Sequence, residues 1–250
     1  MRCSRLWHTV GMAAIRTARE RAREELTREI KAEARRQLAV EGAQRLSLRA
    51  VARELGMVSS ALYRYFPSRD DLLTALIIDA YNSLGEEVEA AVAAVPPADT
   101  RARWVALCHA ARAWALASPH EYALVYGSPV PGYVAPQETI APASRVPLAL
   151  IALAADTVGR FELDAAPRPL RGVLAQQMAD LAAQLAPELN PVLLTRGVAA
   201  WSQLFGMISF ELFGQFVGSA DPADGFFGYV VEDLADYLGL GPAPAPGEPG

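Results

Sequence analysis

Residues 47–66 constrain the fold of this chain more than any other stretch, and they read SLRAVARELGMVSSALYRYF. The first half repeats apolar residues at the i, i+3, i+4 and i+7 spacing of one helix face. These residues are Leu48, Val51, Ala52 and Leu55. Gly56 then suits the left-handed residue that ends a helix, and Pro67 stops a second short helix that begins near Ser59. Two short helices joined by a tight turn form a helix-turn-helix pattern.

The second of these helices carries side chains that suit DNA. Ser59 and Ser60 stand at its start, where either can cap the helix and where hydroxyls can bond base edges or phosphates. Tyr63, Arg64 and Tyr65 follow, with two phenolic hydroxyls and a guanidinium for the phosphate backbone. A plain helical hairpin with surface tyrosines fits the same pattern, so the motif alone leaves the two interpretations about even.

The charge of the chain is distributed unevenly. The whole chain has a formal net charge of −5. Residues 1–70, however, carry 15 Arg or Lys and 8 Asp or Glu, whereas residues 71–250 carry 8 basic and 20 acidic residues. A basic segment around the helix-turn-helix points to an anionic partner at that end. A solvated charged helix over residues 20–36 is the alternative.

Length and composition exclude several classes of protein. A chain of 250 residues can bury a large core without disulfides. It has no run of roughly 18 or more uncharged apolar residues, so we expect no membrane span, and no apolar signal sequence follows its first arginines. Cys3 and Cys108 make no disulfide framework, which favours a reducing, cytoplasmic setting.

No residues stand at the spacing of a catalytic or metal site. The three histidines lie far apart and are not spaced as metal ligands with the two cysteines. They are His8, His109 and His120. The chain also has no nucleophile elbow, phosphate-binding loop or dinucleotide fingerprint. We therefore expect no metal, no cofactor and no enzymatic activity.

The remaining chain consists of predicted helices separated by breaks. Ser68 and Asp71 form a capping box that opens a long helix over 69–94, and the five prolines of residues 127–147 exclude a continuous helix there. No stretch has the alternation typical of a strand. The further expected helices cover residues 27–41, 100–117, 120–126, 147–160, 168–186, 192–216 and 222–238.

These helices predict an all-α fold with two domains. Residues 20–80 form an N-terminal three-helix helix-turn-helix domain, and residues 81–240 form a larger C-terminal helical domain. Residues 1–19 and 241–250 are expected to be disordered tails, and Met12 is an alternative start.

Residues 56–81, GMVSSALYRYFPSRDDLLTALIIDAY, resemble the DNA-binding domain of TetR-type transcriptional regulators, and the resemblance begins near Ile30. Further on, WSQLFGMISFEL and the upstream SPHEYALVYG resemble the WHG type of TetR C-terminal domain. One position departs from the family pattern. Val58 stands where many members have a Ser or Thr that caps the recognition helix.

The resemblance implies roles for residues of the helix-turn-helix. The residues facing base edges would be Ser59, Ser60 and Ala61. The residues contacting phosphates would be Ser47, Arg49, Tyr63, Arg64, Tyr65 and Arg69, with a base contact as the alternative for Arg64. The core would contain Leu48, Val51, Leu55, Leu62 and Phe66. Because phosphate contacts release counterions, DNA binding should weaken strongly with salt.

The resemblance also implies that the C-terminal domain dimerises. The helices over 168–186 and 192–216 would pair across a two-fold axis as a four-helix bundle. The interface residues would be Leu170, Leu174, Leu181, Val198 and Ile208. Taken without the resemblance, the apolar stripes of these helices favour the alternative, in which they face the core of their own chain.

A ligand pocket in the same domain is a further implication of the resemblance. Its lining residues would be Trp104, His109, Trp114, Tyr122, Tyr126, Met178, Trp201, Phe205 and Phe210. Each of these large residues is, by itself, more typical of a core. The long helix 69–94 would touch both domains and transmit ligand binding to the helix-turn-helix.

Together these features predict a DNA-binding transcriptional regulator, a repressor that a small, largely apolar ligand releases from a palindromic operator. Its partners would be double-stranded DNA, an effector of unknown identity and a second copy of the chain, but no membrane. A transcriptional activator, or a helical interaction protein without ligand control, is the alternative that the sequence leaves open.

Overall fold

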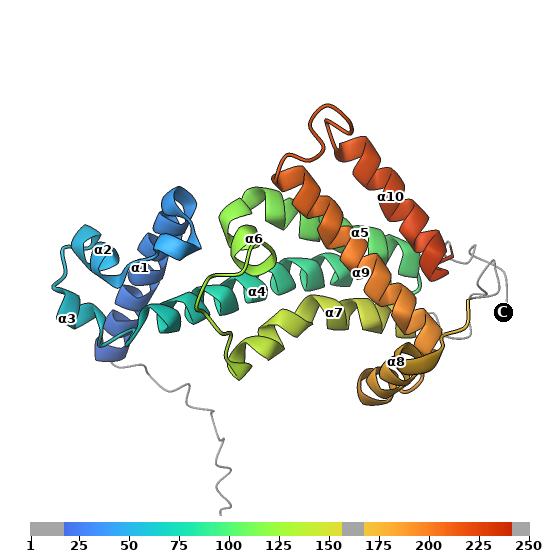
Figure 1. Cartoon of the computed structure of the whole chain (residues 1–250), viewed down its shortest axis with the longest axis horizontal. Coiled ribbons are helices and arrows are strands. Elements are labelled where there is room, and N and C mark those ends of the chain that lie inside the picture. The colour runs from blue at the N-terminus through green and yellow to red at the C-terminus, as the bar shows by residue number, and fades with distance from the viewer. Residues whose placement is uncertain (1–17, 157–167, 242–250) are drawn as a thin grey trace, which may run out of the picture.

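The structure, a computed structural model, describes residues 18–156 and 168–241 (Figure 1). No strand occurs in these residues, so the predicted all-α class is confirmed. Short 3-10 turns, η1 (Ala43–Arg45) and η2 (Gln137–Thr139), precede α2 and α7. The α-helices are α1 (Ala18–Glu41), α2 (Leu48–Glu54), α3 (Ser59–Leu62), α4 (Arg69–Ala93), α5 (Thr100–Ala117), α6 (Pro119–Tyr126), α7 (Ile140–Ala155), α8 (Gly172–Leu185), α9 (Pro191–Leu212) and α10 (Asp224–Leu238).

The first hydrophobic core lies between α1, α2, α3 and the first half of α4. Ile30, Val51 and Leu62 have no exposed surface, and each comes from a different helix. Of the predicted core residues, Leu48, Val51, Leu62 and Phe66 are buried, whereas Leu55 is half-buried and packs against this core. The apolar stripe of residues 47–66 therefore packs against α1 and α4, and this packing presents the opposite face of α2 and α3 to solvent.

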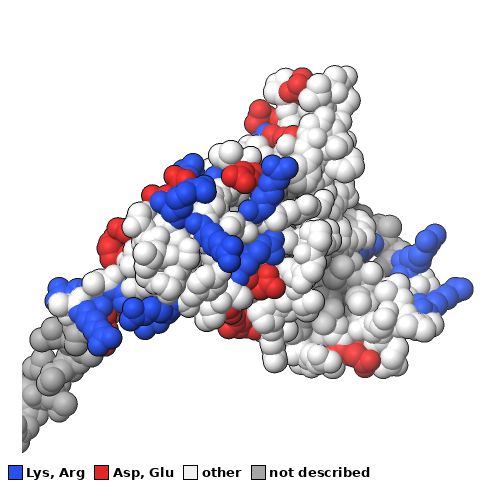
Figure 2. Space-filling view, turned by 60° about the vertical axis from the view of Figure 1, so that its left-hand side comes forward, with Lys and Arg blue, Asp and Glu red and all other residues white. Residues whose placement is uncertain are grey.

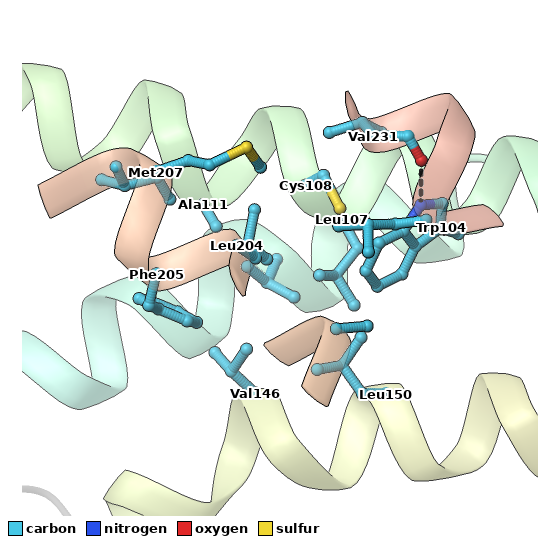
Figure 3. Packing of buried hydrophobic residues seen from close by; sticks show 14 of the residues in the cluster. Trp104, Leu107, Cys108, Ala111, Val146, Leu150, Leu204, Phe205, Met207 and Val231 are labelled. Atoms are coloured by element: carbon cyan, nitrogen blue, oxygen red, sulfur yellow. Dashed lines mark hydrogen bonds between the residues drawn. The ribbon is translucent and has the colours of Figure 1, made fainter. Parts of the chain in front are cut away.

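The second core lies between the second half of α4 and helices α5, α7, α9 and α10. Trp104 has no exposed surface there, and its indole Nε1 donates a hydrogen bond to the Val231 carbonyl over 2.8 Å (Figure 3). Leu107 of α5 and Leu204 of α9 are fully buried in the same cluster. Cys108 is also buried here as a free thiol.

Helix α4 belongs to both cores (Figure 1). Its buried residues pass from the first cluster at Ile77 to the second at Ala80. Ser68 Oγ caps it by accepting a hydrogen bond from the Asp71 N–H over 3.1 Å, as the capping box predicts. The expected boundary at residue 80 falls where α4 leaves the first core, and the division into domains stays a prediction.

Helix α6 and the segment that follows it also contact both cores. Tyr122 is fully buried in the second core, whereas Leu124 and Tyr133 pack against the first. Val125 packs against both. The Tyr133 and Thr74 hydroxyls lie 2.9 Å apart and share a hydrogen bond, which ties this segment to α4.

Helix α1 begins at Ala18, ahead of the apolar pattern that starts near residue 27. Residues 18–25 are exposed, so no apolar stripe marks this part of the helix. Ala, Arg and Glu are strong helix formers, and they continue the helix beyond its packed part. The predictions for residues 1–17, 157–160 and 242–250 lie outside the described residues.

Helix α7 begins at Ile140, earlier than the proline content of residues 127–147 predicts. Pro142 lies in the first turn, where a helix needs no backbone N–H donor. Pro147 is inside the helix and removes one helical hydrogen bond there. The expectation of an irregular segment therefore holds only up to the 3-10 turn η2.

Within the described residues, one helical segment, Gln137–Ala155, is long and apolar enough by composition to cross a membrane. In the folded chain it contributes Val146, Leu150 and Leu153 to the second core. Arg145 of the same helix pairs with Glu89 of α4 over 2.6 Å. We therefore assign the segment as a core helix of this domain.

Candidate DNA-binding surface and ligand cavities

Helix α2 is positioned by a cap and by buried side chains. Ser47 Oγ accepts a hydrogen bond from the Ala50 N–H at 3.4 Å. The buried residues are Leu48, Val51 and Ala52. Gly56 follows with a φ of 65°, the left-handed conformation that the sequence predicts for it. Arg49 is exposed on the outer face, and the Ser47 hydroxyl, which accepts the capping bond, can still donate a hydrogen bond.

Helix α3, the candidate recognition helix, starts without a side-chain cap. Val58 occupies the N-cap position, is 70% exposed and offers no side-chain oxygen to the helix. Capping by Ser59 or Ser60 was expected from the sequence, and this expectation is wrong because both lie inside the helix. The Ser60 hydroxyl is exposed, while Ser59 and Ala61 are half-buried. Of the three predicted base-facing residues, Ser60 is thus the most accessible.

The predicted phosphate contacts differ in their exposure. Arg49, Tyr63 and Arg64 are exposed. Tyr65 is half-buried, and the Arg23 guanidinium carbon lies 5.7 Å from the centroid of its ring. Exposed guanidinium and phenol groups beside α3 can reach a phosphate backbone without rearrangement of the core.

Arg69 is the exception in this set because its guanidinium bonds the protein itself. Its Nη2 donates to the Ala43 carbonyl over 2.8 Å, and its Nε donates to the Leu46 carbonyl over 3.2 Å. These bonds connect the start of α4 to the turn that precedes α2. Sequence reasoning missed this role, because residues 43 and 69 are far apart along the chain.

A groove of about 380 Å³ lies between α1 and α3. Arg19, Arg23 and Arg64 line it, and Ala61 forms part of its α3 wall. Lys and Arg gather on the end of the molecule that carries these helices, as Figure 2 shows. Arg19 was assigned to a tail from the sequence, whereas it lies in α1 beside the candidate recognition helix.

Arg35 of α1 connects the helix-turn-helix to α4 and α6. Its Nη2 donates to Asp79 Oδ2 and its Nε to Glu121 Oε1, each over 2.6 Å. Lys31 Nζ also donates to the Asp79 carboxylate, over 2.8 Å. No spacing in the sequence indicates this network, because its partners come from three helices.

Most of the predicted ligand-lining residues lie in the core or at the surface. Trp104, Trp114, Tyr122 and Phe205 are buried, whereas His109 and Phe210 are exposed and Met178 is half-buried. The Tyr122 hydroxyl donates to the Phe205 carbonyl over 2.8 Å. Burial raises the pKa of Tyr122 to about 12. Only Tyr126 and Trp201 of the nine residues line the cavities described next.

A cavity of about 260 Å³, here called the aliphatic cavity, lies between α7, α8 and α9. Among the described residues that form its walls, none is charged or bears a hydroxyl. The lining residues are Pro147, Leu150, Ile151, Ala154, Leu181, Leu185, Leu189, Leu193, Leu194, Gly197, Val198 and Trp201. Leu181 and Val198, predicted for a dimer interface, thus face this cavity.

A second cavity of about 660 Å³, the tyrosine cavity, lies between α4, α7 and the segment after α6. Tyr81, Tyr126 and Tyr133 line it, together with Ser144 and Thr139, and no charged residue occurs in the part of its lining that the structure describes. Burial is the main cause that raises the pKa values of Tyr81 and Tyr126. The side chains of Tyr81 and Tyr126 therefore stay neutral over the physiological pH range.

Trp201 and Pro147 line both cavities. The Trp201 ring contacts Phe205 at a centroid distance of 6.0 Å, and Phe205 stacks on Tyr126 at 4.2 Å. The Trp201 indole Nε1 is buried without a hydrogen-bond partner. This aromatic row connects the cavities to α6.

A buried ion pair, which sequence reasoning missed, holds α5 against α9. Arg112 Nε and Nη2 donate to the two Glu211 carboxylate oxygens over 2.7 and 2.6 Å. Arg112 Nη1 also donates to Asp224 over 2.9 Å, and this hydrogen bond lowers the pKa of the Asp224 carboxyl.

In the part of the chain that the structure describes, no group of three or more His, Cys, Asp or Glu is arranged to hold a metal ion.

The predicted dimer residues do not form one surface. Ile208 has no exposed area and packs in the second core, so its assignment to an interface is wrong. Leu174 is 44% exposed and Leu170 is half-buried.

Another exposed apolar surface, here called the aromatic patch, lies at the end of α9 and the start of α10. Its half-buried member Phe216 contacts Phe210 and Phe226, and its exposed members are Phe210, Phe213, Val217, Phe226 and Tyr229.

Two protein-family models match the chain. Residues 30–76 match the model of bacterial regulatory proteins of the tetR family. Residues 104–234 match the model of a tetracyclin repressor-like C-terminal domain. The two matched segments correspond to the first and second hydrophobic cores.

Relatives of known sequence cover most of the chain. The HTH-type transcriptional regulator Rv1816 of Mycobacterium tuberculosis H37Rv is 40% identical over 203 residues, which is 79% of this chain and 85% of that protein. Mb1846 of Mycobacterium bovis, also an HTH-type transcriptional regulator, has the same identity and coverage.

Solved structures share the fold. SCO4313, described as a regulatory protein, has a TM-score of 0.72 at 37% identity, over 87% of this chain and 98% of its own. PfmR, a TetR family transcriptional regulator from Thermus thermophilus, has a TM-score of 0.51 at 18% identity, over 85% of this chain and 97% of its own.

Proposed function

The chain is a transcriptional regulator of the TetR family, and we propose that it is a homodimeric repressor that a small, largely apolar ligand releases from a palindromic operator. One observation carries this proposal. Helices α4 and α6, which pack against the core beneath the exposed, arginine-bearing surface of α2 and α3, also line the tyrosine cavity, and that cavity shares Pro147 and Trp201 with the aliphatic cavity.

On the DNA side, α3 enters the major groove. Ser60 meets a base edge because it is the exposed hydroxyl of this helix, and Ser59 and Ala61 flank it. Arg49, Tyr63 and Arg64 contact phosphates on either side, with Ser47 and Tyr65 completing the set. Arg69 acts mainly by fixing the turn before α2.

The dimer forms through the aromatic patch. Phe210 is 52% exposed and Tyr229 is 67% exposed, and ring contacts through Phe216 connect the two helices that carry the patch. An exposed apolar patch of this kind is unusual in a soluble monomer. A second copy of the chain covers it, because a two-fold pair of α9 and α10 gives one recognition helix to each half of a palindrome.

Ligand control operates through the contacts between α1, α4 and α6. Glu121 of α6 and Asp79 of α4 both hold Arg35 of α1, so a shift of either helix changes the position of the helix-turn-helix. A ligand lowers DNA affinity by binding better to the arrangement in which the two recognition helices no longer match the half-sites.

The test is selection of bound DNA from a randomised pool by the full chain at a stated salt concentration. We expect a palindromic sequence, bound by two chains. A promoter fused to this sequence should be silenced in a reporter assay when the protein is present. Enrichment of no sequence contradicts the DNA-binding surface, and a rise in reporter activity identifies an activator instead.

Residue-level support comes from the double variant Arg49→Ala with Tyr63→Phe. It should lower affinity for the selected DNA about tenfold or more, because it removes two phosphate contacts. The matched control, Arg171→Ala with Tyr237→Phe, changes an exposed arginine just before α8 and an exposed tyrosine on α10, and it should keep the affinity. Equal affinities for both variants would favour a helical interaction protein.

A further inference from the structure

Trp201, which is half-buried, has an unusual environment among the indoles of the described chain. The Nε1 of Trp104 donates to the Val231 carbonyl over 2.8 Å, and that of Trp114 donates to Ser83 Oγ over 3.0 Å. The Nε1 of Trp201 has no partner, although it is buried. Because buried donors are nearly always bonded, an unpartnered indole N–H on a residue that lines both cavities is a group that can gain a hydrogen bond from an acceptor on a ligand.

The chemistry of the aliphatic cavity restricts that ligand. Leu150 and Ile151 of α7, Leu181 and Leu185 of α8, and Val198 of α9 form its walls, and none of its described lining residues is charged. The same holds for the described residues that line the tyrosine cavity beyond Trp201. A charged group would lose its hydration in either cavity without gaining an ionic partner. The lining therefore selects an uncharged molecule.

The volume of the aliphatic cavity restricts the length of the ligand. The cavity measures about 260 Å³. This equals the volume of about nine water molecules, so it accommodates an alkyl chain of about ten carbons. The cavity is lined by aliphatic side chains, with Trp201 as its single aromatic residue. A saturated chain is thus the complementary shape.

We propose that the effector is an uncharged compound with a saturated hydrocarbon chain and one hydrogen-bond acceptor, such as an ester or ketone. Its chain fills the aliphatic cavity, and its acceptor receives the Trp201 Nε1–H. This inference rests on the proposed ligand-controlled function. Because Nε1 is buried, the indole turns on binding, and its contact with Phe205, which stacks on Tyr126, carries the movement to α6.

The experiment measures binding to the full chain by calorimetry without DNA. The probes are methyl decanoate, decanoic acid, decylamine and decane, each below its aggregation limit. We expect methyl decanoate to bind at least tenfold more tightly than the acid or the amine, because both carry a charge at pH 7. Decane, which has no acceptor, should bind more weakly than the ester.

Two variants test the site itself. Gly197→Leu places a side chain in the aliphatic cavity, and a Cβ at this glycine meets no atom within 4 Å, so the helix accepts it. It should abolish ester binding, whereas Ala152→Leu, on the exposed face of α7, should leave binding unchanged. Trp201→Phe keeps an aromatic ring but removes the N–H. It should weaken methyl decanoate about five- to tenfold and decane hardly at all.

The outcomes separate this inference from the proposed function. Equal or tighter binding of a charged probe, no binding of any probe, or full ester binding by Gly197→Leu overturns the inference. A second measurement follows the affinity for the selected DNA with each probe. Release of DNA by the acid or the amine would keep the proposed function and overturn the ligand class. Absence of any DNA binding would overturn the proposed function, while calorimetry still decides the ligand.

Discussion

Arg69 differs from the other arginines of the DNA-binding unit because its guanidinium already bonds two backbone carbonyls. Arg69→Gln breaks these bonds, so we expect the free energy of unfolding to fall by about 1–2 kcal/mol. The number of counterions released on DNA binding should stay the same. Urea unfolding and the salt dependence of DNA affinity measure the two effects.

Arg49→Ala is the matched comparison for Arg69→Gln. Arg49 is exposed on α2, so its removal should leave stability unchanged and lower the slope of log K against log salt by about one. If Arg69→Gln lowered this slope and kept full stability, Arg69 would be a phosphate contact, as the family resemblance implies.

Tyr122 makes stability depend on alkaline pH. Burial raises its pKa from 10.0 to about 12 in the folded chain. The stability that the neutral Tyr122 hydroxyl contributes is therefore complete below pH 10 and is lost as the pH rises from about 10 to about 12. Tyr122→Phe removes the bond to the Phe205 carbonyl and should cost about 1 kcal/mol at pH 7.

The pH dependence of stability provides the control for the Tyr122→Phe variant. Because the variant has no hydroxyl to ionise at residue 122, the stability difference from the natural chain should shrink above pH 10. Tyr229→Phe, at a residue that is 67% exposed, should give equal stabilities at pH 7. Unfolding by urea at several pH values measures both variants, and a Tyr122→Phe difference that is constant up to pH 12 contradicts the assignment.

Single residues of the helix-turn-helix were predictable because their roles depend on local spacing. Val51 and Leu62 are buried as their stripe predicts, and Gly56 has the expected left-handed φ. Ile208 was not predictable in the same way. An apolar stripe on α9 looks the same whether it faces its own core or another chain, and only the tertiary packing decides.

At the level of elements, the packing of α7 on α4 depends on Gly85. A Cβ at this position would lie 2.7 Å from Arg145 Cδ and 2.9 Å from its Cβ. Arg145 crosses α4 there to bond Glu89 and the Asn82 carbonyl. Gly85→Ala should therefore lower the free energy of unfolding by about 1–3 kcal/mol, although alanine is the better helix former.

Gly197→Ala supplies the control for this prediction. Gly197 lies in α9, and a Cβ there meets nothing within 4 Å. The substitution should raise stability by up to about 1 kcal/mol, because it gains only helix propensity. Thermal or urea unfolding measures the stability of Gly85→Ala and Gly197→Ala. Equal stabilisation by both would contradict the prediction, because Arg145 would then move away from a Cβ at residue 85 without cost.

The helices themselves were largely predictable, and their ends were not. The capping box at Ser68 predicted the start of α4 correctly because cap and helix are neighbours in sequence. The first turns of α1 carry no apolar stripe. In α7, Pro142 lies in the first turn, where a proline is tolerated, and Pro147 interrupts a helix that packs in the second core. Propensity and tertiary packing, rather than periodicity, form these parts.

At the scale of the whole molecule, the sequence predicts two units but not the contacts that join them. The basic first segment and the apolar helices after residue 81 indicate separate roles. The Arg35 network and the placement of α6 against both cores depend on pairs far apart along the chain. The cavities are equally non-local, because each is formed by residues from several helices.

The aromatic patch gives the last prediction, which concerns the assembled molecule. Phe210→Glu with Tyr229→Glu places charges at two exposed positions of α9 and α10. Charges that become buried against a second chain lose their hydration, so the dimer should dissociate into folded monomers. Sedimentation measures the mass in solution and so detects dissociation. Circular dichroism measures the helical content and shows whether the monomers stay folded.

The control for the dimer is the pair Val173→Glu with Leu174→Glu on α8. These residues are 74% and 44% exposed, and Leu174 belongs to the interface that the sequence predicts. This variant should remain dimeric and bind the palindrome with unchanged affinity. The aromatic-patch variant should bind at least tenfold more weakly, because each monomer contacts only one half-site. If the α8 variant dissociated and the aromatic-patch variant did not, the interface would lie on α8, and the exposed aromatic rings of α9 and α10 would need another partner.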